Sequence, residues 1–259
     1  ATRRLAILLD RGDTVKRDAV AARFWAERTL SNPPRDATRG DLVAFLARLL
    51  VTSDKPEERA RGLDLLERTS KAGIFGAKRE LARAIRYENP VRARQLLEEA
   101  ASPDPGGAKP LLAEMLLSGE GGPADPKRAL SLIKGSRTAS GEHLLGRLTL
   151  EGKLVPRDPQ EAARLIGLAG AWDVDARTEV LKILATNPDV RDNDPKRTLY
   201  DAVEAAELDE PGALAALIDL KLSANAQFRD PAGACKWIET AISRGDRAMA
   251  ARLPECRAS

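Results

Sequence analysis

The side chains that could do chemistry in this chain are few and far apart. Among 259 residues there are one histidine, His143, and two cysteines, Cys235 and Cys256. A catalytic triad needs a nucleophile, a histidine and an orienting acid, and nothing in the sequence points to that arrangement around His143. His143 stands beside the apolar pair Leu144-Leu145. We therefore expect a structural or surface histidine and no catalytic residue.

Metal binding is not indicated either. One histidine and two widely spaced cysteines make neither a Cys₂His₂ site nor an HExxH pair. Segment 191–197 reads RDNDPKR and holds Asp192 and Asp194, but basic residues interrupt the alternating acidic loop that calcium needs. We predict no metal and no cofactor, with an ordinary loop and helix cap at this segment.

Two further patterns look like active-site motifs when they are taken singly. SGEGG at 118–122 lacks the Gly-Lys-Ser/Thr ending of a phosphate-binding loop, and it follows no expected strand. Paired carboxylates such as Glu57-Glu58 and Glu98-Glu99 are expected by chance, because 31% of the residues are charged. General acid–base catalysis is therefore not indicated, and we predict that the protein is not an enzyme.

The helices that must position these side chains are predicted from a repeated sequence pattern. Among the Asp-Pro dipeptides of the chain, those at 125, 158, 194 and 230 are spaced by 33, 36 and 36 residues. Asp is a favoured N-cap, and Pro suits the first helical position, where its missing N–H is no loss. Asn89-Pro90 is a substituted copy, and Asp18 is a copy without its proline. Such a period is typical of a stacked helical-repeat protein.

Each Asp-Pro separates two helical patterns. LLAEMLLSGEGGPAD at 111–125 and LLGRLTLEGKLVPRD at 144–158 align without a gap, with apolar residues at helical spacing and then a glycine. The unit is therefore helix A, a loop with a C-capping glycine, an Asp-Pro cap and helix B. Helix B repeats a small residue followed by a bulky pair, as in Ala129, Leu132 and Ile133.

These patterns predict an all-α fold with no substantial sheet. We expect an α-solenoid of about seven antiparallel helix pairs followed by a C-terminal capping helix. Residues 1–259 are expected to form one elongated domain, because each repeat buries its apolar face against the next. The expected units are 1–31, 38–72, 75–103, 106–138, 140–173, 175–209 and 211–245, with the cap at 246–259.

The two cysteines fall in the last unit and its cap. Cys235 lies on the last helix B, and Cys256 lies 21 residues further on, in the expected capping helix. Adjacent antiparallel helices place such positions side by side, so a disulfide is geometrically possible, with two buried free thiols as the alternative. A disulfide would indicate an oxidising compartment, and the even count and terminal placement favour export.

Charge and hydropathy narrow the range of partners. The chain has 42 basic and 39 acidic residues, interspersed rather than in blocks, with a net charge of +3. This is typical of solvated helix faces, so we predict no nucleic-acid partner. No apolar run approaches the roughly 18–20 residues that span a bilayer. Ala1 leads directly into a helical pattern, so we expect no signal peptide here, and a removed signal or lipidated leader stays open.

The repeat resembles that of the Sel-one-like family, a cousin of the tetratricopeptide repeat. The best match is LLGRLTLEGKLVPRDPQEAARLI at 144–166, which includes Leu145-Gly146, Gly152 and Val155. The next best match lies at 111–133, and the resemblance covers nearly the whole chain.

Departures from the family pattern indicate a divergent, bacterial-type member. The family usually has tyrosine at the end of helix A, where this chain has Leu117, Leu150 and Leu222. Inside helix B, only Trp25 and Trp237 keep the usual aromatic residue.

The resemblance implies a right-handed superhelix whose concave inner surface binds protein. Known members are mostly adaptors. Many bacterial members are exported to the envelope, where some support exopolysaccharide secretion and some restrain sensor kinases. We therefore expect a non-catalytic scaffold that holds a partner protein or peptide in its groove, in the periplasm or envelope, with the cytoplasm as the alternative. The other hypotheses are an extracytoplasmic regulator of a membrane sensor kinase and, from another class, an enzyme with its site in the groove.

Side chains that line such a groove should come from helix A, on the face away from the apolar stripe. Glu114 and Arg147 occupy equivalent positions there and are the candidate binding residues. Solvated charge is the alternative for both. The sequence specifies neither the partner nor the oligomeric state.

Overall fold

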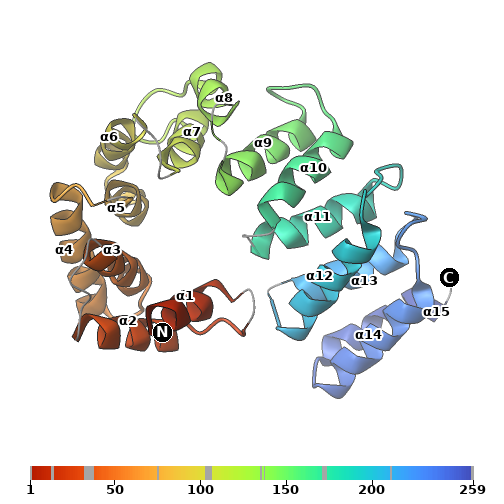
Figure 1. Ribbon diagram of the computed structural model, residues 1–259. Coiled ribbons are helices and arrows are strands. Elements are labelled where there is room, and N and C mark those ends of the chain that lie inside the picture. Colours follow the sequence, from red (N-terminus) through yellow and green to blue (C-terminus); the bar gives the residue numbers. More distant parts are fainter. Residues whose placement is uncertain are drawn as a thin grey trace. The chain divides into compact units, whose positions relative to one another are not determined.

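The computed structural model describes residues 2–12, 15–31, 38–74, 76–102, 107–134, 136, 138–170, 174–210 and 212–257. Every regular element in these ranges is a helix, so the expected all-α fold is confirmed (Figure 1). The chain divides into two compact units, Ala1–Gly141 and Glu142–Ser259. The right-handed coiling and the single elongated domain stay predictions.

The described residues of the first unit form four helix pairs that follow one another along the chain. The helices of each pair pack together, as do helix B of one pair and helix A of the next. They are α1 (Thr2–Arg11), α2 (Ala19–Ser31), α3 (Thr38–Val51), α4 (Pro56–Lys71), α5 (Ala77–Ile85), α6 (Pro90–Ala100), α7 (Ala108–Ser118) and α8 (Pro126–Lys134).

The second unit contains the remaining helices, and α9 spans the boundary between the units. In this unit α11 packs against α10 and α13, and α13 packs against α12 and α14. The helices are α9 (Ala139–Glu151), α10 (Pro159–Gly170), α11 (Val174–Thr186), α12 (Pro195–Glu207), α13 (Ala213–Leu222), α14 (Pro231–Ser243), a 3₁₀ helix η1 (Arg247–Arg252) and α15 (Leu253–Arg257).

The repeated Asp-Pro is a repeated helix N-cap, as the sequence predicts. At six helix starts, the cap side chain accepts a hydrogen bond from the backbone N–H three residues later. The cap residues are Asp18, Asn89, Asp125, Asp158, Asp194 and Asp230, with distances of 2.8–3.1 Å. The substituted copy and the copy without proline are therefore true members of the series.

The cap residue also ties helix B to helix A through its own backbone. The N–H of Asp125 donates to the carbonyl of Leu116 at 2.8 Å, and that of Asp158 donates to Thr149 at 3.1 Å. Asp18 and Asp230 make the same bond to the carbonyl nine residues earlier. Because one residue caps helix B and binds the end of helix A, it sets the hairpin between the two helices.

Replacing Asp125 with alanine is expected to lower the free energy of unfolding by about 1 kcal/mol, because the Arg128 N–H loses its acceptor. Asp125→Asn should keep most of the stability, since Asn89 caps α6 in the same way. Urea unfolding followed by circular dichroism measures both. Equal losses in the two variants would contradict the capping role.

The loop glycines between helix A and helix B have a structural role. Gly119 ends α7 with φ +77° and donates its N–H to the Met115 carbonyl at 2.9 Å. Gly152 has φ +73°, and a Cβ there would lie 2.6 Å from the Cβ of Arg157. A left-handed backbone favours glycine, so SGEGG is the turn of the repeat, as predicted.

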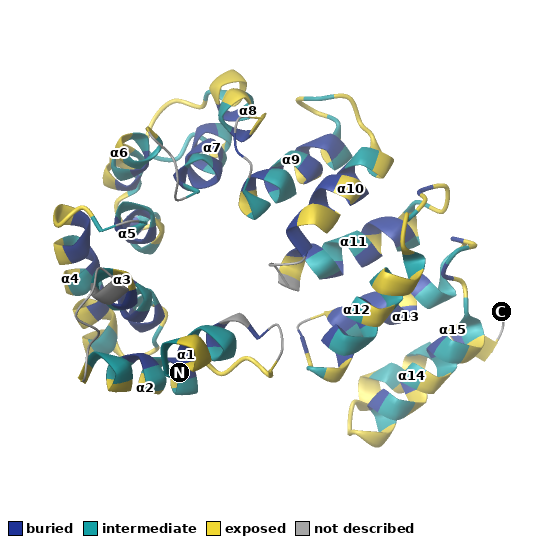
Figure 2. Ribbon diagram, viewed as in Figure 1, coloured by how far each residue is buried: buried dark blue, intermediate teal, exposed yellow. Residues whose placement is uncertain are grey.

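Small residues at the start of helix B let the helices of each unit approach closely. The alanine four residues after the cap has no exposed surface in five helices: Ala22, Ala93, Ala129, Ala162 and Ala234. Larger side chains such as Leu66, Leu97 and Ile166 are also fully buried. The buried residues occupy the sides of the helices that face their neighbours (Figure 2).

The C-terminal cap differs from the single helix that the sequence predicts. Residues 247–252 form η1, and a new helix, α15, starts at Leu253. Pro254 explains the break, because it has no N–H to continue the hydrogen-bond ladder and fits only the first turn of a new helix. The segment still covers the last pair, since both η1 and α15 pack against α14.

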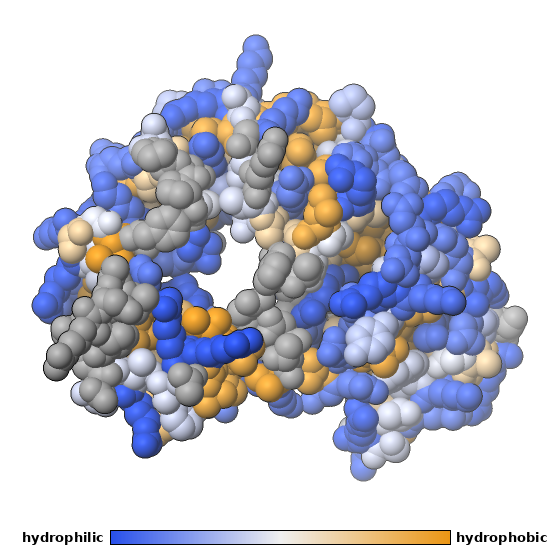
Figure 3. Space-filling model, viewed as in Figure 1, coloured by the Kyte–Doolittle hydropathy of each residue, from blue (hydrophilic) through white to orange (hydrophobic). Residues whose placement is uncertain are grey.

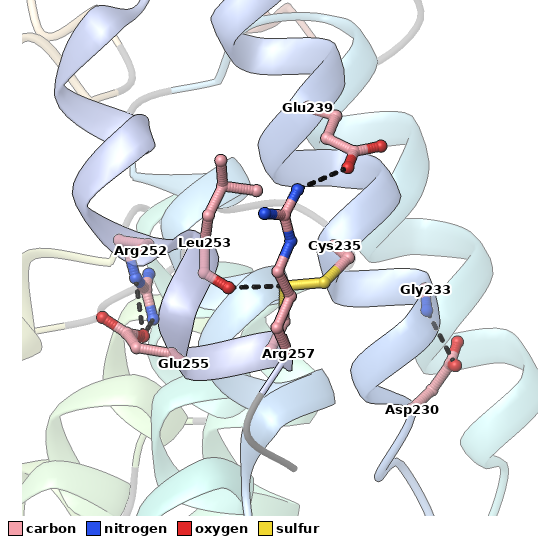
Figure 4. The surroundings of a disulfide bond; sticks show 9 residues. Asp230, Gly233, Cys235, Glu239, Arg252, Leu253, Glu255 and Arg257 are labelled. Carbon is pink, nitrogen blue, oxygen red and sulfur yellow. Dashed lines mark hydrogen bonds and ion pairs between the residues drawn. A yellow bond between two sulfur atoms is a disulfide. The ribbon is translucent and has the colours of Figure 1, made fainter.

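A disulfide joins Cys235 of α14 to Cys256 of α15, with a Cα–Cα distance of 5.5 Å (Figure 4). Cys256 is buried in a cluster with Ile218, Ala234 and Ile238. Beside the bond, the Arg257 guanidinium lies 3.6 Å from the Glu239 carboxylate of α14. The short cap is therefore held to the last pair by a covalent bond as well as by packing.

Candidate interaction surface

The A helices of neighbouring repeats lie next to each other within each unit. In the first unit α5 contacts both α3 and α7, and in the second unit α11 contacts α13. We use the term A-helix surface for the exposed residues of α1, α3, α5 and α7 in the first unit and of α9, α11 and α13 in the second. Hydrophilic side chains cover much of the face visible in Figure 3, with smaller hydrophobic areas among them.

Glu114 lies on this surface and links two repeats. Its Oε2 atom is 2.8 Å from Nη1 of Arg86, which lies directly after α5. Arg86 also donates from Nε and Nη2 to the two oxygens of Glu120, at 2.5 and 3.0 Å. The Glu114 side chain keeps 43% of its surface exposed. It is thus available to a partner only in competition with Arg86.

Arg147 lies on the A-helix surface of the second unit and also approaches a neighbouring repeat. Its Nε atom is 4.0 Å from Oε1 of Glu179 in α11, and 55% of its side chain is exposed. His143, one turn earlier, places Nε2 2.7 Å from Oε2 of the same Glu179. The single histidine of the chain is thus part of a link between α9 and α11.

Glu114 and Arg147 belong to a position that recurs in other repeats. Asp219, eleven residues before its cap as they are, pairs with Arg252 of η1 at 2.7 Å. Arg83 takes the corresponding place after Leu81 in α5, and it is exposed with no ion pair to a described residue. In these four repeats the position lies on the accessible side of helix A, and in three of them it also links helices, whereas the corresponding residue of α11, Ile183, is buried.

The sequence pattern does not reveal Arg86 and Glu179, the residues with which Glu114 and Arg147 pair. Arg86 lies 28 residues from Glu114 and Glu179 lies 32 residues from Arg147, so both pairs join successive repeats. The signal available in the sequence was opposite charge at roughly one repeat of separation.

The two hydrogen bonds from Arg86 hold the pKa of Glu120 below its usual range, although partial burial acts in the opposite direction. The resulting stability is present above the pKa of an unfolded-chain glutamate and is lost as pH falls through the lower folded value. Arg86→Gln is expected to raise the pKa of Glu120, measured by carbon NMR of its carboxyl group. Arg83→Gln on the same repeat is the control and should leave that pKa unchanged. An unchanged pKa in Arg86→Gln would refute the assignment.

Among the described residues, potential metal ligands are dispersed. Among them, no three His, Cys, Asp or Glu side chains are grouped so as to hold a metal ion. In segment 191–197, Asp194 caps α12 and Asp192 accepts a hydrogen bond from the Asp194 N–H at 3.0 Å. Both residues have the local loop and cap roles that the sequence predicts.

Each unit has a hollow lined by described residues. One, of about 190 Å³, lies between α3 and α5 in the first unit. The other, of about 390 Å³, lies beside Trp237 and Arg244 of the second unit, at the ends of α12 and α14. The first of these belongs to the A-helix surface, because both of its helices are A helices.

Stacked helix pairs with repeated caps define a helical-repeat protein. The family model described as Sel1 repeat matches residues 1–31, 75–102, 111–134 and 139–171. The chain therefore carries Sel1 repeats, as its sequence resemblance predicts. Sel1 repeats are generally non-catalytic scaffolds for protein interaction. Among curated proteins, no sequence matches this chain.

Two solved structures have a similar fold. One is a protective antigen present in uropathogenic Escherichia coli strains and displaying an SLR fold, with 18% identity, a TM-score of 0.59, and coverage of 98% of this chain and 55% of that one. The other is a Sel1 repeat protein from Oxalobacter formigenes, with 17% identity, a TM-score of 0.54, and coverage of 98% and 75%. The chain thus spans about half the length of the antigen. None of the described helices is long and apolar enough to cross a membrane.

Proposed function

We propose that this protein is a non-catalytic scaffold that binds a partner protein or peptide on its A-helix surface. The observation that carries the proposal is the charged position at Arg83 and Glu114 in the first unit and at Arg147 and Asp219 in the second, which places exposed or partly exposed polar groups on A helices of each unit. Within each unit, these groups offer a bound chain contacts from more than one A helix, as in other stacked repeat proteins.

We further propose that the protein works in the periplasm or envelope. The Cys235–Cys256 disulfide supports this, because such bonds persist mainly in oxidising compartments. An exopolysaccharide-secretion assembly and a membrane sensor kinase are the two partner classes proposed. Cell fractionation with thiol alkylation tests the location. A reduced protein found only in the cytoplasm would contradict it.

Site-specific photo-crosslinking in the native cell tests the scaffold. A photoreactive amino acid is placed at Arg83 or Arg147 on the A-helix surface, or at exposed Lys127 of α8 and Lys236 of α14 as matched B-helix controls. The proposal expects one partner protein at both A-helix positions and not at the B-helix ones. Crosslinking from the B helices alone would overturn it. The identity of the partner decides between a secretion assembly and a sensor kinase.

A further inference from the structure

The hollow between α3 and α5 is lined by acidic, basic and apolar side chains. Seven residues form it, all on or next to these two A helices: Asp41, Ala44, Phe45, Arg48, Gly76, Arg79 and Glu80. Its volume of about 190 Å³ gives room for one extended side chain rather than for a folded element. It therefore has the size of a pocket for a single residue of a bound peptide.

Both cations of the wall already have anionic partners. Nη2 of Arg48 lies 2.5 Å from Oδ2 of Asp10, which projects from α1 and is 8% exposed. Nη2 of Arg79 lies 2.5 Å from Oε1 of Glu80, and its Nε lies 3.1 Å from the same oxygen. An acidic ligand would have to compete with these two carboxylates for the guanidinium groups.

The two carboxylates that line the hollow have fewer hydrogen-bond and ion-pair partners than its two arginines. Glu80 is 7% exposed, and its Oε2 atom has no hydrogen-bond partner among the described residues. Asp41, in the first turn of α3, is exposed and forms no ion pair with a described residue. Together with Asp10, the carboxylates outnumber Arg48 and Arg79 by three to two. A buried carboxylate oxygen without a partner is costly, so a rotation of the Glu80 side chain that lets Oε2 accept an N–H from a ligand gains binding energy.

We propose that this hollow binds a basic side chain, lysine or arginine, of a peptide held on the A-helix surface. The inference rests on the scaffold function proposed above and names the chemistry of its ligand. The cation approaches Glu80 and Asp41, and charge-assisted hydrogen bonds to carboxylates are among the stronger ones. The aliphatic stem lies against Ala44 and the Phe45 ring, as long basic side chains often do.

Proton–nitrogen NMR of the full chain tests the inference with blocked pentapeptides, Ac-Ala-Ala-Xaa-Ala-Ala-NH₂. With arginine as Xaa, we expect saturable shifts at the amides of 41–48 and 76–80. Peptides with norleucine or glutamate as Xaa should bind about tenfold more weakly or not at all, since they lack the donors for Glu80 and Asp41. Equal binding of the norleucine peptide, tighter binding of the glutamate peptide, or no shift at these amides overturns the inference.

Substitutions of the two carboxylates test whether they bind the arginine peptide. Glu80→Gln and Asp41→Asn should each lower the affinity for the arginine peptide by about threefold to tenfold, because each removes a carboxylate that lines the hollow. Asp41 is exposed, so its variant should fold even where Glu80→Gln does not. Asp175→Asn is the matched control, because Asp175 stands in the first turn of α11 as Asp41 does in α3. An Asp41→Asn variant that binds like the control contradicts the inference.

The inference and the scaffold function fail in different ways. If no basic peptide binds here but crosslinking still finds one partner at the A-helix positions, only the basic pocket is wrong. If the A-helix positions capture no partner, the scaffold itself is wrong.

Discussion

Replacing Gly62 with alanine is expected to destabilise the first unit by about 1–3 kcal/mol, although alanine is the better helix former. Gly62 is buried inside α4, where a Cβ would lie 2.8 Å from the Val51 nitrogen and 2.9 Å from the Ala47 oxygen. These are backbone atoms of α3, which cannot move aside as a flexible side chain does. The new methyl group must therefore push α3 and α4 apart. Urea unfolding followed by circular dichroism measures the change.

Gly167 of α10 provides the matched control. It is also a helical glycine, but no heavy atom outside its own helix turn lies within 4 Å of a Cβ built there. Gly167→Ala is therefore expected to stabilise the protein by roughly 0.5–1 kcal/mol, the usual gain from restricting the unfolded chain in a helix. The structure predicts opposite signs for the two substitutions. Stabilisation by Gly62→Ala would contradict the close packing of α3 and α4.

Loss of the Cys235–Cys256 bond is the other change with a large expected effect. The two cysteines are 21 residues apart, and a closed loop of that length is worth about 3 kcal/mol in the chain-entropy model. The Cys235→Ala/Cys256→Ala double variant should therefore unfold its C-terminal layer at lower urea concentration. Because Cys256 also packs against Ile218 and Ile238, exposure of this layer is best followed by hydrogen exchange of α14.

Reductant provides the control for the disulfide. It should shift the wild-type protein toward the double variant and leave the double variant unchanged. Mass spectrometry after alkylation, with and without prior reduction, shows the bond directly. Two thiols that are alkylated without reduction, together with stability that reductant does not change, would contradict a structural disulfide.

The caps and glycines could be predicted from the sequence because their roles are local. Asp158 binds an N–H three residues later, and Gly152 needs only its own left-handed backbone. Such effects depend on the neighbouring residues alone, so aligning two repeats is enough to find them. The break before α15 could also have been predicted, because Pro254 has no N–H to continue a helix from the preceding residues.

The surface could be predicted only in part, because it depends on how one repeat meets the next. Glu114 and Arg147 were placed on helix A correctly by their register, but their partners Arg86 and Glu179 come from other repeats. The loop after α5 is shorter than the loop after α7, so a fixed offset between repeats does not give these pairs. The burial of Glu80 likewise follows from the approach of α3 to α5, which no residue pattern specifies.

The central claim is that the A-helix surface binds the partner, and the dissociation constant of the purified, crosslinked partner tests it most directly. The Arg83→Glu/Arg147→Glu variant reverses two exposed charges on the A helices, and Lys127→Glu/Lys236→Glu makes the same change on the B helices. We predict binding at least about tenfold weaker for the first variant and nearly unchanged for the second, as measured by calorimetry. An unchanged affinity in the A-helix variant, with the loss confined to the B-helix variant, would contradict the claim.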